Sequence, residues 1–257
     1  MTEPKPTDST DTPLPPHPVL DRYYPDAAHR GPRVQQLFDA SAPFYDVINR
    51  MMSFGSGQWY RQRVLLQSGL QPGHKVLDVG CGTGMIARLA ADIVGSDGQV
   101  IALDPSPGML RQAIRNGVST PVLAVGERLP FTDGRFDLLS MGYALRHVAD
   151  LTEAFREYRR VLKPGGQVLL LEITPPRSKL AYQVLKFYLK RVVPLLSRLR
   201  GNREAQTLMS YYWDTIEQCV PPEAILAALN RAGFEQVERQ IDLGIFSNYR
   251  GRRPTDA

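Results

Sequence analysis

The chain has 257 residues, of which 43% are hydrophobic and 22% are charged, and its formal net charge is +5. These values are ordinary for a soluble globular protein and exclude a fibrous or fully disordered chain. Two cysteines exclude a disulfide framework, and the charge is too mild to indicate a nucleic-acid partner unless it is concentrated in one segment.

The first residues, "MTEPKPTDSTDTPLPPHP", lack the basic start and the apolar core of a signal peptide. They are rich in proline, threonine and aspartate, so they predict a flexible tail over residues 1–18, followed by a single domain over residues 19–257. No window approaches the run of about 20 apolar residues that spans a bilayer. With only two cysteines, we expect the protein in a reducing cytoplasm.

The segment "VQQLFDASAPFYDVINRMMSF", which begins at Val34, places apolar side chains at near-helical spacing and is interrupted by Pro43. It predicts two short helices, and a third is expected over Trp59 to Leu66. Together these pre-core helices occupy residues 34–70.

From Lys75 onward, short apolar runs alternate with helical stretches. The runs "KVLDVG", "QVIALD", "PVLAVG", "FDLLSMG" and "QVLLLEI" suit strands that are buried on both faces. The helices are expected near Met85–Val94, Ser106–Asn116 and Asp150–Leu162. This alternation predicts an α/β fold with a parallel sheet. The final "EQVERQIDLGIFSNYRGRR" predicts two strands joined at Gly244 at an antiparallel edge.

Three glycines, Gly80, Gly82 and Gly84, follow the first strand and open a helix. Such a loop lets a nucleotide approach the backbone at the positive end of the helix. A dinucleotide fingerprint requires glycine where Met85 stands, so that motif fails. Asp104 closes the next strand, where a carboxylate can bind ribose hydroxyls. The alternative is that the glycines only shape a turn and Asp104 caps the next helix.

Five motifs now occur in a familiar order: "VLDVGCGTG", "LDPSPGML", "ERLPF", "RFDLL" and "RVLKPGGQVLLLE". In this order they resemble the class I S-adenosylmethionine-dependent methyltransferases, over residues 34–253. Within that class the chain resembles the ubiquinone/menaquinone biosynthesis C-methyltransferases (UbiE-like), through "YDVINRMMS", "YALRHVAD" and "GIF". The resemblance implies a Rossmann-like fold with a mostly parallel seven-stranded sheet, flanking helices and a helical lid.

The resemblance also implies S-adenosylmethionine as cofactor and a lipophilic aromatic substrate, a demethyl-quinol methylated at a ring carbon. The residues it assigns to the cofactor are Asp78, Gly80, Gly82, Gly84, Asp104, Met109 and Glu127. The sequence departs from the usual family pattern at several positions, which weakens the assignment of the substrate. These positions are Ile48, Gly57, Tyr60, Val125 and Thr174.

A ring carbon becomes nucleophilic when its phenol ionises, so the site needs a group that stabilises a phenolate. Arg146 follows the fourth strand, and the resemblance supports this role for it. The alternative is a structural ion pair with an acid such as Asp150. His147 is a candidate proton relay, with packing or helix capping as the alternative.

Tyr45 and Asp46 lie in the pre-core helices and are candidates to close over the acceptor, although an aromatic residue there also suits simple packing. His17, His29 and His74 do not have the spacing of metal ligands, so no metal is expected.

Residues 173–203 contain eight Lys or Arg and no acid, and apolar residues recur there near helical spacing. A basic amphipathic helix of this kind, over Lys179 to Arg203, suits an anionic membrane surface. The alternative is a lid helix that packs its apolar side on the core. The whole insertion is expected over residues 175–217, and Tyr212 and Trp213 are either pocket walls or core.

Other functions stay open on the sequence. The same cofactor loop and basic helix would serve N-methylation of a phospholipid amine, O-methylation of a phenolic metabolite, or binding of S-adenosylmethionine without catalysis. The sequence predicts no particular oligomeric state.

Overall fold

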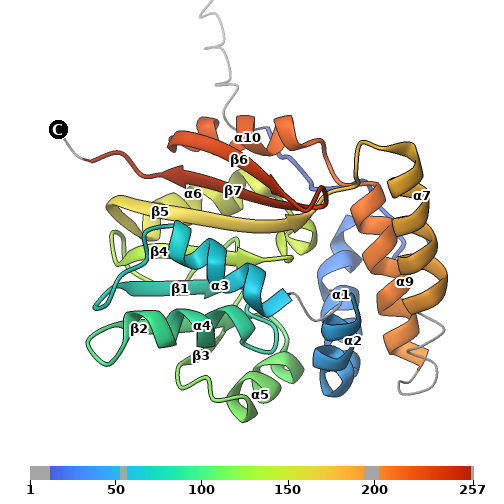
Figure 1. Cartoon of the computed structure of the whole chain (residues 1–257), viewed down its shortest axis with the longest axis horizontal. Helices are drawn as coiled ribbons and strands as arrows, with labels where there is room; N and C mark the ends of the chain where they lie inside the picture. Colours follow the sequence, from blue (N-terminus) through green and yellow to red (C-terminus); the bar gives the residue numbers. More distant parts are fainter. Residues whose placement is uncertain (1–11, 53–56, 194–202, 256–257) are drawn as a thin grey trace, which may run out of the picture.

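The computed structural model describes residues 12–52, 57–193 and 203–255. In this part of the chain a seven-stranded sheet has the order β3-β2-β1-β4-β5-β7-β6 (Figure 1). The strands are β1 Lys75–Val79, β2 Gln99–Asp104, β3 Pro121–Leu123, β4 Phe136–Gly142, β5 Leu162–Ile173, β6 Glu235–Asp242 and β7 Phe246–Arg252. The first five run parallel, and β7 pairs antiparallel with both β5 and β6. The predicted mostly parallel sheet with an antiparallel edge is confirmed.

Alternating side chains of the strands feed two cores, one on each face of the sheet. In β1, Leu77 and Val79 join the core beneath α6 (Leu151–Val161) and α10 (Pro222–Arg231). Val76 points to the other face, toward α3 (Gly57–Gln67) and α4 (Met85–Val94). Because successive side chains of a strand point to opposite faces, burial of both faces explains why these runs are apolar throughout.

The helices between the strands lie close to their predicted ranges. α4 matches its prediction, α5 spans Pro107–Arg115, and α6 begins after Asp150. Ser106 and Asp150 cap α5 and α6, since their side-chain oxygens accept hydrogen bonds from the N–H groups of Met109 and Thr152. These caps fix where the two helices begin.

The pre-core region begins earlier than the apolar spacing predicts. α1 spans Ala27–Ser41 and starts seven residues before Val34, because the Asp26 carboxylate caps it by accepting from the His29 N–H at 3.0 Å. The interruption at Pro43 is a 3-10 turn, Ala42–Phe44, which leads into α2, Tyr45–Met52.

Residues 12–18 pack against the core, so the prediction of a flexible tail up to residue 18 is wrong for this part. The Leu14 N–H donates to Asp150 at 2.9 Å, and Pro16 accepts a hydrogen bond from the Val220 N–H at 2.8 Å. His17 is 2% exposed, with Nε2 at 2.9 Å from an Arg30 nitrogen. These long-range contacts offset the entropy cost of ordering residues 12–18, whereas the composition predicted that this cost would keep them flexible. Residues 1–11 lie outside the described residues.

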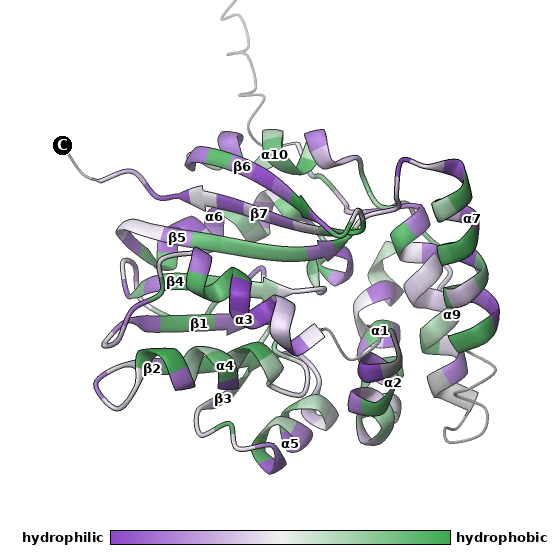
Figure 2. Cartoon of the chain, in the orientation of Figure 1, coloured by the Kyte–Doolittle hydropathy of each residue, from purple (hydrophilic) through white to green (hydrophobic). Residues whose placement is uncertain are grey.

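A third core lies beside the sheet, where α1 packs on the insertion. The insertion comprises α7 (Lys179–Phe187), a π-helical turn (Tyr188–Val192) and α9 (Arg203–Glu217). The buried residues of this third core include Leu37 of α1, Leu189 of the turn and Trp213 of α9. Figure 2 shows hydrophobic residues on both α7 and α9. Among the described residues, none of the helices combines the length and apolar content that a membrane span requires.

Candidate active site

The glycine loop lies at the carboxyl end of β1, and its three glycines all have positive φ: +64° at Gly80, +56° at Gly82 and +84° at Gly84. A Cβ added to Gly80 would lie only 2.6 Å from the Ala144 Cβ, and one added to Gly84 would lie 2.4 Å from Val118. Glycine is therefore required at these two positions by both conformation and space.

Asp104 closes β2 beside this loop. Its carboxylate accepts hydrogen bonds from the N–H groups of Gly82 and Ser106, each at 2.8 Å. Burial raises the pKa of Asp104 to about 6. The predicted pairing of glycine loop and strand-ending acid therefore brings the two groups into direct contact.

Asp78 lies on β1 and is 1% exposed. Its Oδ1 accepts from the Ser140 hydroxyl at 2.7 Å, whereas its Oδ2 is buried and has no partner in the described structure. Burial raises its pKa to about 7. A buried carboxylate oxygen without a donor is costly, so this atom suits a ligand that brings a donor.

Two further residues assigned to the cofactor lie outside the pocket lining. Met109 is buried in the first turn of α5, with its N–H bonded to the Ser106 hydroxyl at 3.0 Å. Glu127 accepts a hydrogen bond from the Ala149 N–H and so joins the loop after β3 to the loop after β4. Neither contact tests a role in cofactor binding, which stays a prediction for both residues.

A pocket opens between the glycine loop, α2, α3 and the end of β4. The residues that line it are Tyr45, Asn49, Arg61, Asp78, Gly80, Cys81, Gly82, Thr83, Met85, Ile86, Gly142 and Tyr143. It thus lies outside the carboxyl ends of β1 and β4, where α/β sheets commonly bind ligands.

Two aspartates hold the pre-core helices over this region. Asp46 of α2 accepts hydrogen bonds from the Thr83 hydroxyl at 2.5 Å and from the Asn116 amide at 3.0 Å. Asp39 of α1 accepts from the Ser106 hydroxyl and the Gly108 N–H, each at 2.6 Å. Asp46, a candidate to close over the acceptor, instead holds α2 against the glycine loop.

Arg146 is completely buried, and all three of its side-chain nitrogens have partners. Nε donates to Glu172 Oε2 at 2.8 Å, and the other two nitrogens donate to Thr215 Oγ1 and to the backbone oxygens of Tyr212 and Tyr143. Arg146 therefore forms a structural ion pair, but with Glu172 of the neighbouring strand. Asp150, the partner considered from the sequence, caps α6 instead.

His147 and Tyr45 belong to a cluster of aromatic rings packed against one another, which we call the aromatic chamber. Its members are Phe38, Tyr45, His147, Tyr211 and Tyr212. The hydroxyl oxygens of Tyr45 and Tyr212 lie 2.5 Å apart, and Tyr45 also reaches the glycine loop near Gly82. Burial is the main cause that holds the pKa of His147 well below its usual value, and the positive charge of the nearby Arg146 lowers it further, so the ring is neutral.

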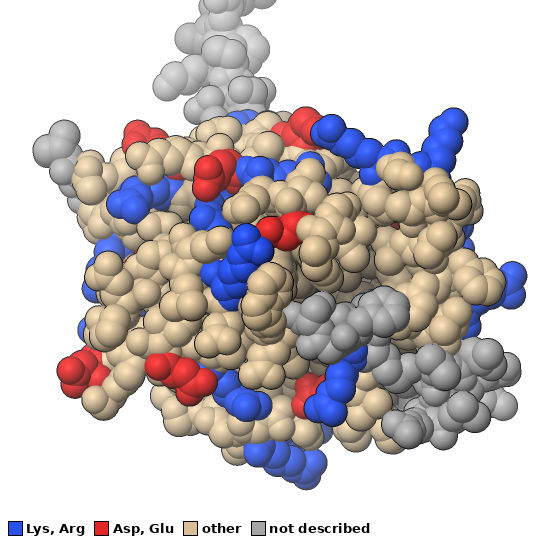
Figure 3. Space-filling model, in the orientation of Figure 1, with Lys and Arg blue, Asp and Glu red and all other residues tan. Residues whose placement is uncertain are grey.

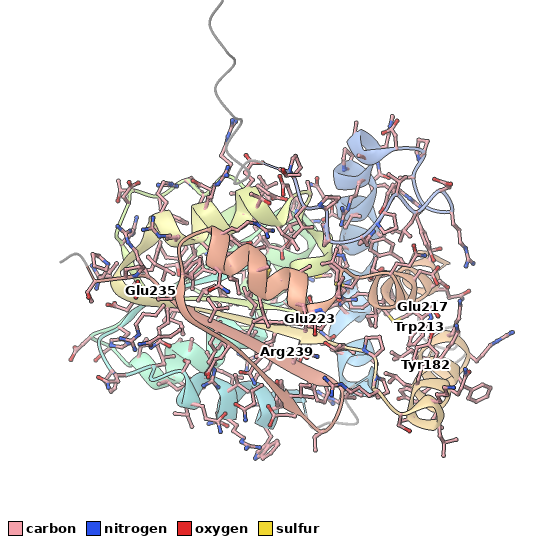
Figure 4. All side chains as sticks on the ribbon, turned by 90° about the horizontal axis from the view of Figure 1, so that it is seen from above. Tyr182, Trp213, Glu217, Glu223, Glu235 and Arg239 are labelled. Carbon is pink, nitrogen blue, oxygen red and sulfur yellow. The ribbon has the colours of Figure 1, made fainter. Side chains whose placement is uncertain are left out.

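Tyr212 and Trp213 have different neighbours within the third core. Tyr212 faces the aromatic chamber, whereas the Trp213 indole N–H donates to Glu217 at 2.9 Å and its ring lies beside Tyr182 of α7. Figure 4 shows Tyr182, Trp213 and Glu217 together at the contact of α7 with α9. Both residues are thus buried in the third core, and neither lines the pocket.

Sequence reasoning missed Tyr143 and Arg61, which both line the pocket. Tyr143 has a φ of +61°, which is uncommon outside glycine and often marks functional positions. Its place directly after β4 could have suggested it, because strand ends at this edge meet at the pocket. Arg61 carries no such signal, since the sequence of α3 has no clear apolar face.

The fold and this pocket define a class I S-adenosylmethionine-dependent methyltransferase. One solved structure with the same fold is an S-adenosylmethionine-dependent methyltransferase from Aquifex aeolicus, with a TM-score of 0.56, 19% identity and coverage of 75% of this chain and 89% of that chain. Another, a possible histamine N-methyltransferase from Thermotoga maritima, has a TM-score of 0.60, 20% identity and coverage of 85% and 98%. At these identities the likeness shows the fold alone.

The family model described as the ubiE/COQ5 methyltransferase family matches residues 27–253, and the chain belongs to that family. The ubiquinone/menaquinone biosynthesis C-methyltransferase UbiE of Cupriavidus necator is 35% identical over 239 residues, which cover 89% of this chain and 95% of that protein. The protein of the same name from Pseudoalteromonas translucida is 33% identical over 226 residues, covering 85% and 89%. The chain is therefore a methyltransferase that uses S-adenosylmethionine.

The residues of the site fit this cofactor. The glycine loop lets a ligand approach the backbone, Asp104 is placed to hold ribose hydroxyls, and the unpartnered Oδ2 of Asp78 suits an ammonium group. No group of three or more metal-binding side chains occurs among the residues that the structure describes.

Proposed function

We propose that this enzyme methylates a ring carbon of a lipophilic demethyl-quinol. Its relatives are named as C-methyltransferases of ubiquinone and menaquinone biosynthesis. The observation that carries the proposal is the aromatic chamber beside the glycine loop, because an apolar ring packs well against aromatic faces and edges. An amine substrate would be better served by carboxylates in these positions.

We assign Tyr45 and Tyr212 the role of stabilising the phenolate form of the acceptor. Burial raises the pKa of both phenols, so both remain protonated hydrogen-bond donors near neutral pH. The guanidinium carbon of Arg146 lies 5.2 Å from the centre of the Tyr212 ring and favours negative charge there. Since its nitrogens are already bonded, we assign Arg146 a positioning role through Tyr212, in place of the direct contact expected from the sequence.

The ring proton must leave once the new carbon–carbon bond has formed. Bound S-adenosylmethionine supplies an electrophilic methyl group. The Nε2 of His147 is buried with no partner among the described residues, which leaves its lone pair open to a proton. Burial and the charge of Arg146 lower the pKa of His147 and oppose this step, so the proton must pass on from the ring at once. His147 is therefore our candidate for the general base.

The test uses methyl-labelled S-adenosylmethionine and the lipid extract of cells that lack this gene, under reducing conditions with the purified full chain. We expect mass spectrometry to find the label on a ring carbon of a quinol. Label on a phenolic oxygen or on a phospholipid amine would refute the proposal, and no label on any lipid despite cofactor binding would refute it as well.

Variants then connect the reaction to the chamber. Tyr45→Phe and His147→Gln should each lower kcat by roughly 10²- to 10⁴-fold, the usual range for a lost acid–base group. Tyr158→Phe is the matched control, because Tyr158 is buried in the core beneath the sheet, away from the pocket, and its hydroxyl donates a hydrogen bond to the Met141 sulfur at 3.9 Å. If the control and Tyr45→Phe lose activity equally, the chamber is not the reaction site.

We further propose that α7 binds the enzyme to the inner surface of the cytoplasmic membrane. Leu180, Val184 and Phe187 recur at i, i+4 and i+7 on this helix and are 76%, 62% and 64% exposed. A contiguous exposed apolar stripe is unusual on a soluble protein and is typical of interaction surfaces. We call these three residues the α7 stripe.

The opposite side of α7 is already bonded to α9, so the stripe is free to contact a membrane. The Tyr182 hydroxyl and Lys186 Nζ both bond to Glu217 Oε1, each at 2.5 Å, and Leu185 packs against the third core. Lys and Arg side chains follow the edge of the molecule that holds α7 in Figure 3. Exposed Arg177, Lys179 and Arg191 would meet anionic headgroups there.

Burial of the stripe would contribute roughly 3–6 kcal/mol, from three side chains that are about two-thirds exposed. Flotation with vesicles that contain phosphatidylglycerol should therefore recover the wild-type protein. The variant Leu180→Ser/Val184→Ser/Phe187→Ser should bind at least about tenfold more weakly. The control Ile114→Ser/Leu123→Ser, which changes apolar residues 53% and 60% exposed near α5 and β3, should float like the wild type. Equal flotation of all three proteins would refute the membrane role.

A further inference from the structure

Arg61 is a buried cation that forms no ion pair within salt-bridge distance among the described residues, although its charge favours the ionised form of Asp78 in the same pocket. It projects from α3 into the pocket and is 7% exposed. Its guanidinium carbon lies 4.7 Å from the centre of the Tyr143 ring. Within the described residues, no side chain or backbone group is hydrogen-bonded or ion-paired to it. Because a buried charge is costly unless it is paired, the pocket is built for an anionic group at this point.

The position of Arg61 indicates which part of the cofactor it meets. The pocket spans the ends of β1 and β4 and does not include Asp104, which lies at the end of β2. With ribose hydroxyls at Asp104, the end of the cofactor that remains for this pocket is its amino acid. That end carries one ammonium and one carboxylate, and the pocket offers the free Oδ2 of Asp78 and the unpaired guanidinium of Arg61.

We propose that Arg61 binds the carboxylate of the methionine part of S-adenosylmethionine. The planar guanidinium matches a carboxylate with two parallel hydrogen bonds, and the face of Tyr143 holds it in place. The positive φ of Tyr143 is consistent with this use, because it turns the residue after β4 into the pocket. Arg61 is thus a residue that selects the intact amino-acid end of the cofactor.

The test compares two ligands by calorimetry with the full chain: S-adenosylmethionine and its decarboxylated analogue, which lacks only the carboxylate. The wild-type protein should bind the intact cofactor roughly 10- to 100-fold more tightly. Arg61→Gln should lose this preference while keeping its affinity for the analogue, and Arg61→Lys should regain part of it. Retained binding of the analogue also shows that the variant is folded.

Arg63→Gln is the matched control, since Arg63 lies on the same helix, is 43% exposed and faces Asp242 and Trp59. It should bind both ligands like the wild type. Equal binding of both ligands by the wild-type protein would overturn the proposal. If Arg61→Gln lowers the affinity for both ligands equally, Arg61 supports the structure of the pocket. If it lowers the affinity for neither ligand, Arg61 serves the acceptor. Either result would overturn the proposed contact with the carboxylate.

Discussion

Replacement of Arg146 by methionine should destabilise the protein strongly, because it leaves the Glu172 carboxyl group buried without its partner. Arg146 is 0% and Glu172 is 3% exposed, and the two side chains are joined at 2.8 Å. Breaking a buried pair on one side typically costs about 3–5 kcal/mol. For a chain of this size that cost corresponds to a fall in Tm of roughly 6–20 °C.

The double variant Arg146→Met/Glu172→Met separates stability from activity. Removing both charges while keeping similar volume is often close to neutral, so most of the lost stability should return. The hydrogen bonds from Arg146 to the Tyr212 and Tyr143 backbones do not return, so kcat should stay low. Thermal and chemical denaturation of both single variants and the double variant, with methyl transfer measured alongside, gives the coupling free energy.

Two results would refute this reasoning. A loss below about 1 kcal/mol in Arg146→Met would mean that the ion pair does not stabilise the fold. Full recovery of both stability and kcat in the double variant would mean that Arg146 has no part in positioning Tyr212.

Three further predictions concern the cofactor side. Asp46→Ala removes the hydrogen bonds from Thr83 and Asn116, so amide exchange in α2 should speed up by roughly 5- to 100-fold, and unchanged exchange would contradict the clamp. Gly80→Ala should lower Tm more than Gly82→Ala, because the new Cβ meets Ala144 at 2.6 Å in the first case and nothing closer than 3.8 Å in the second. Burial raises the pKa of Asp78 to about 7 from 3.8, so the folded protein binds more protons than the unfolded chain between about pH 4 and 7. The free energy of unfolding of the protein without cofactor should therefore fall as pH rises through this window, while the affinity for the cationic cofactor should rise. In Asp78→Asn, melting experiments should find stability less dependent on pH, and calorimetry should find cofactor affinity less dependent on pH.

The strands, the glycine loop and Asp104 were predictable because their signals are local. Each strand is one continuous apolar run, and the glycines stand directly after the first of them. The partner of Arg146 was not predictable in this way. Asp150 is near in sequence, whereas Glu172 is brought close by the pairing of β4 with β5, which places Gly142 opposite Leu171.

The hydrogen bonds by which Asp39 and Asp46 hold the pre-core helices could not be predicted for the same reason. Asp39 and Ser106 are 67 positions apart, and no periodicity in either helix indicates that they meet. The exposed apolar side of α7 was predictable only in part, because spacing predicts an apolar stripe but not which apolar residues other helices cover. Leu195 and Leu199, which extend the predicted pattern, lie outside the described residues.

The antiparallel pairing of β7 has a consequence for how the chain acquires its structure. β7 pairs with β5 along seven successive residues, from Gln167 opposite Arg252 to Ile173 opposite Phe246. Every residue assigned above to the cofactor precedes β5, yet β5 keeps an open, strongly apolar edge until β7 is in place, and β7 begins 73 residues after β5 ends. During synthesis this edge is the part of the nascent chain most exposed to strand pairing with other chains. A chain cut before Phe246 would therefore keep the whole cofactor loop and still be prone to aggregate.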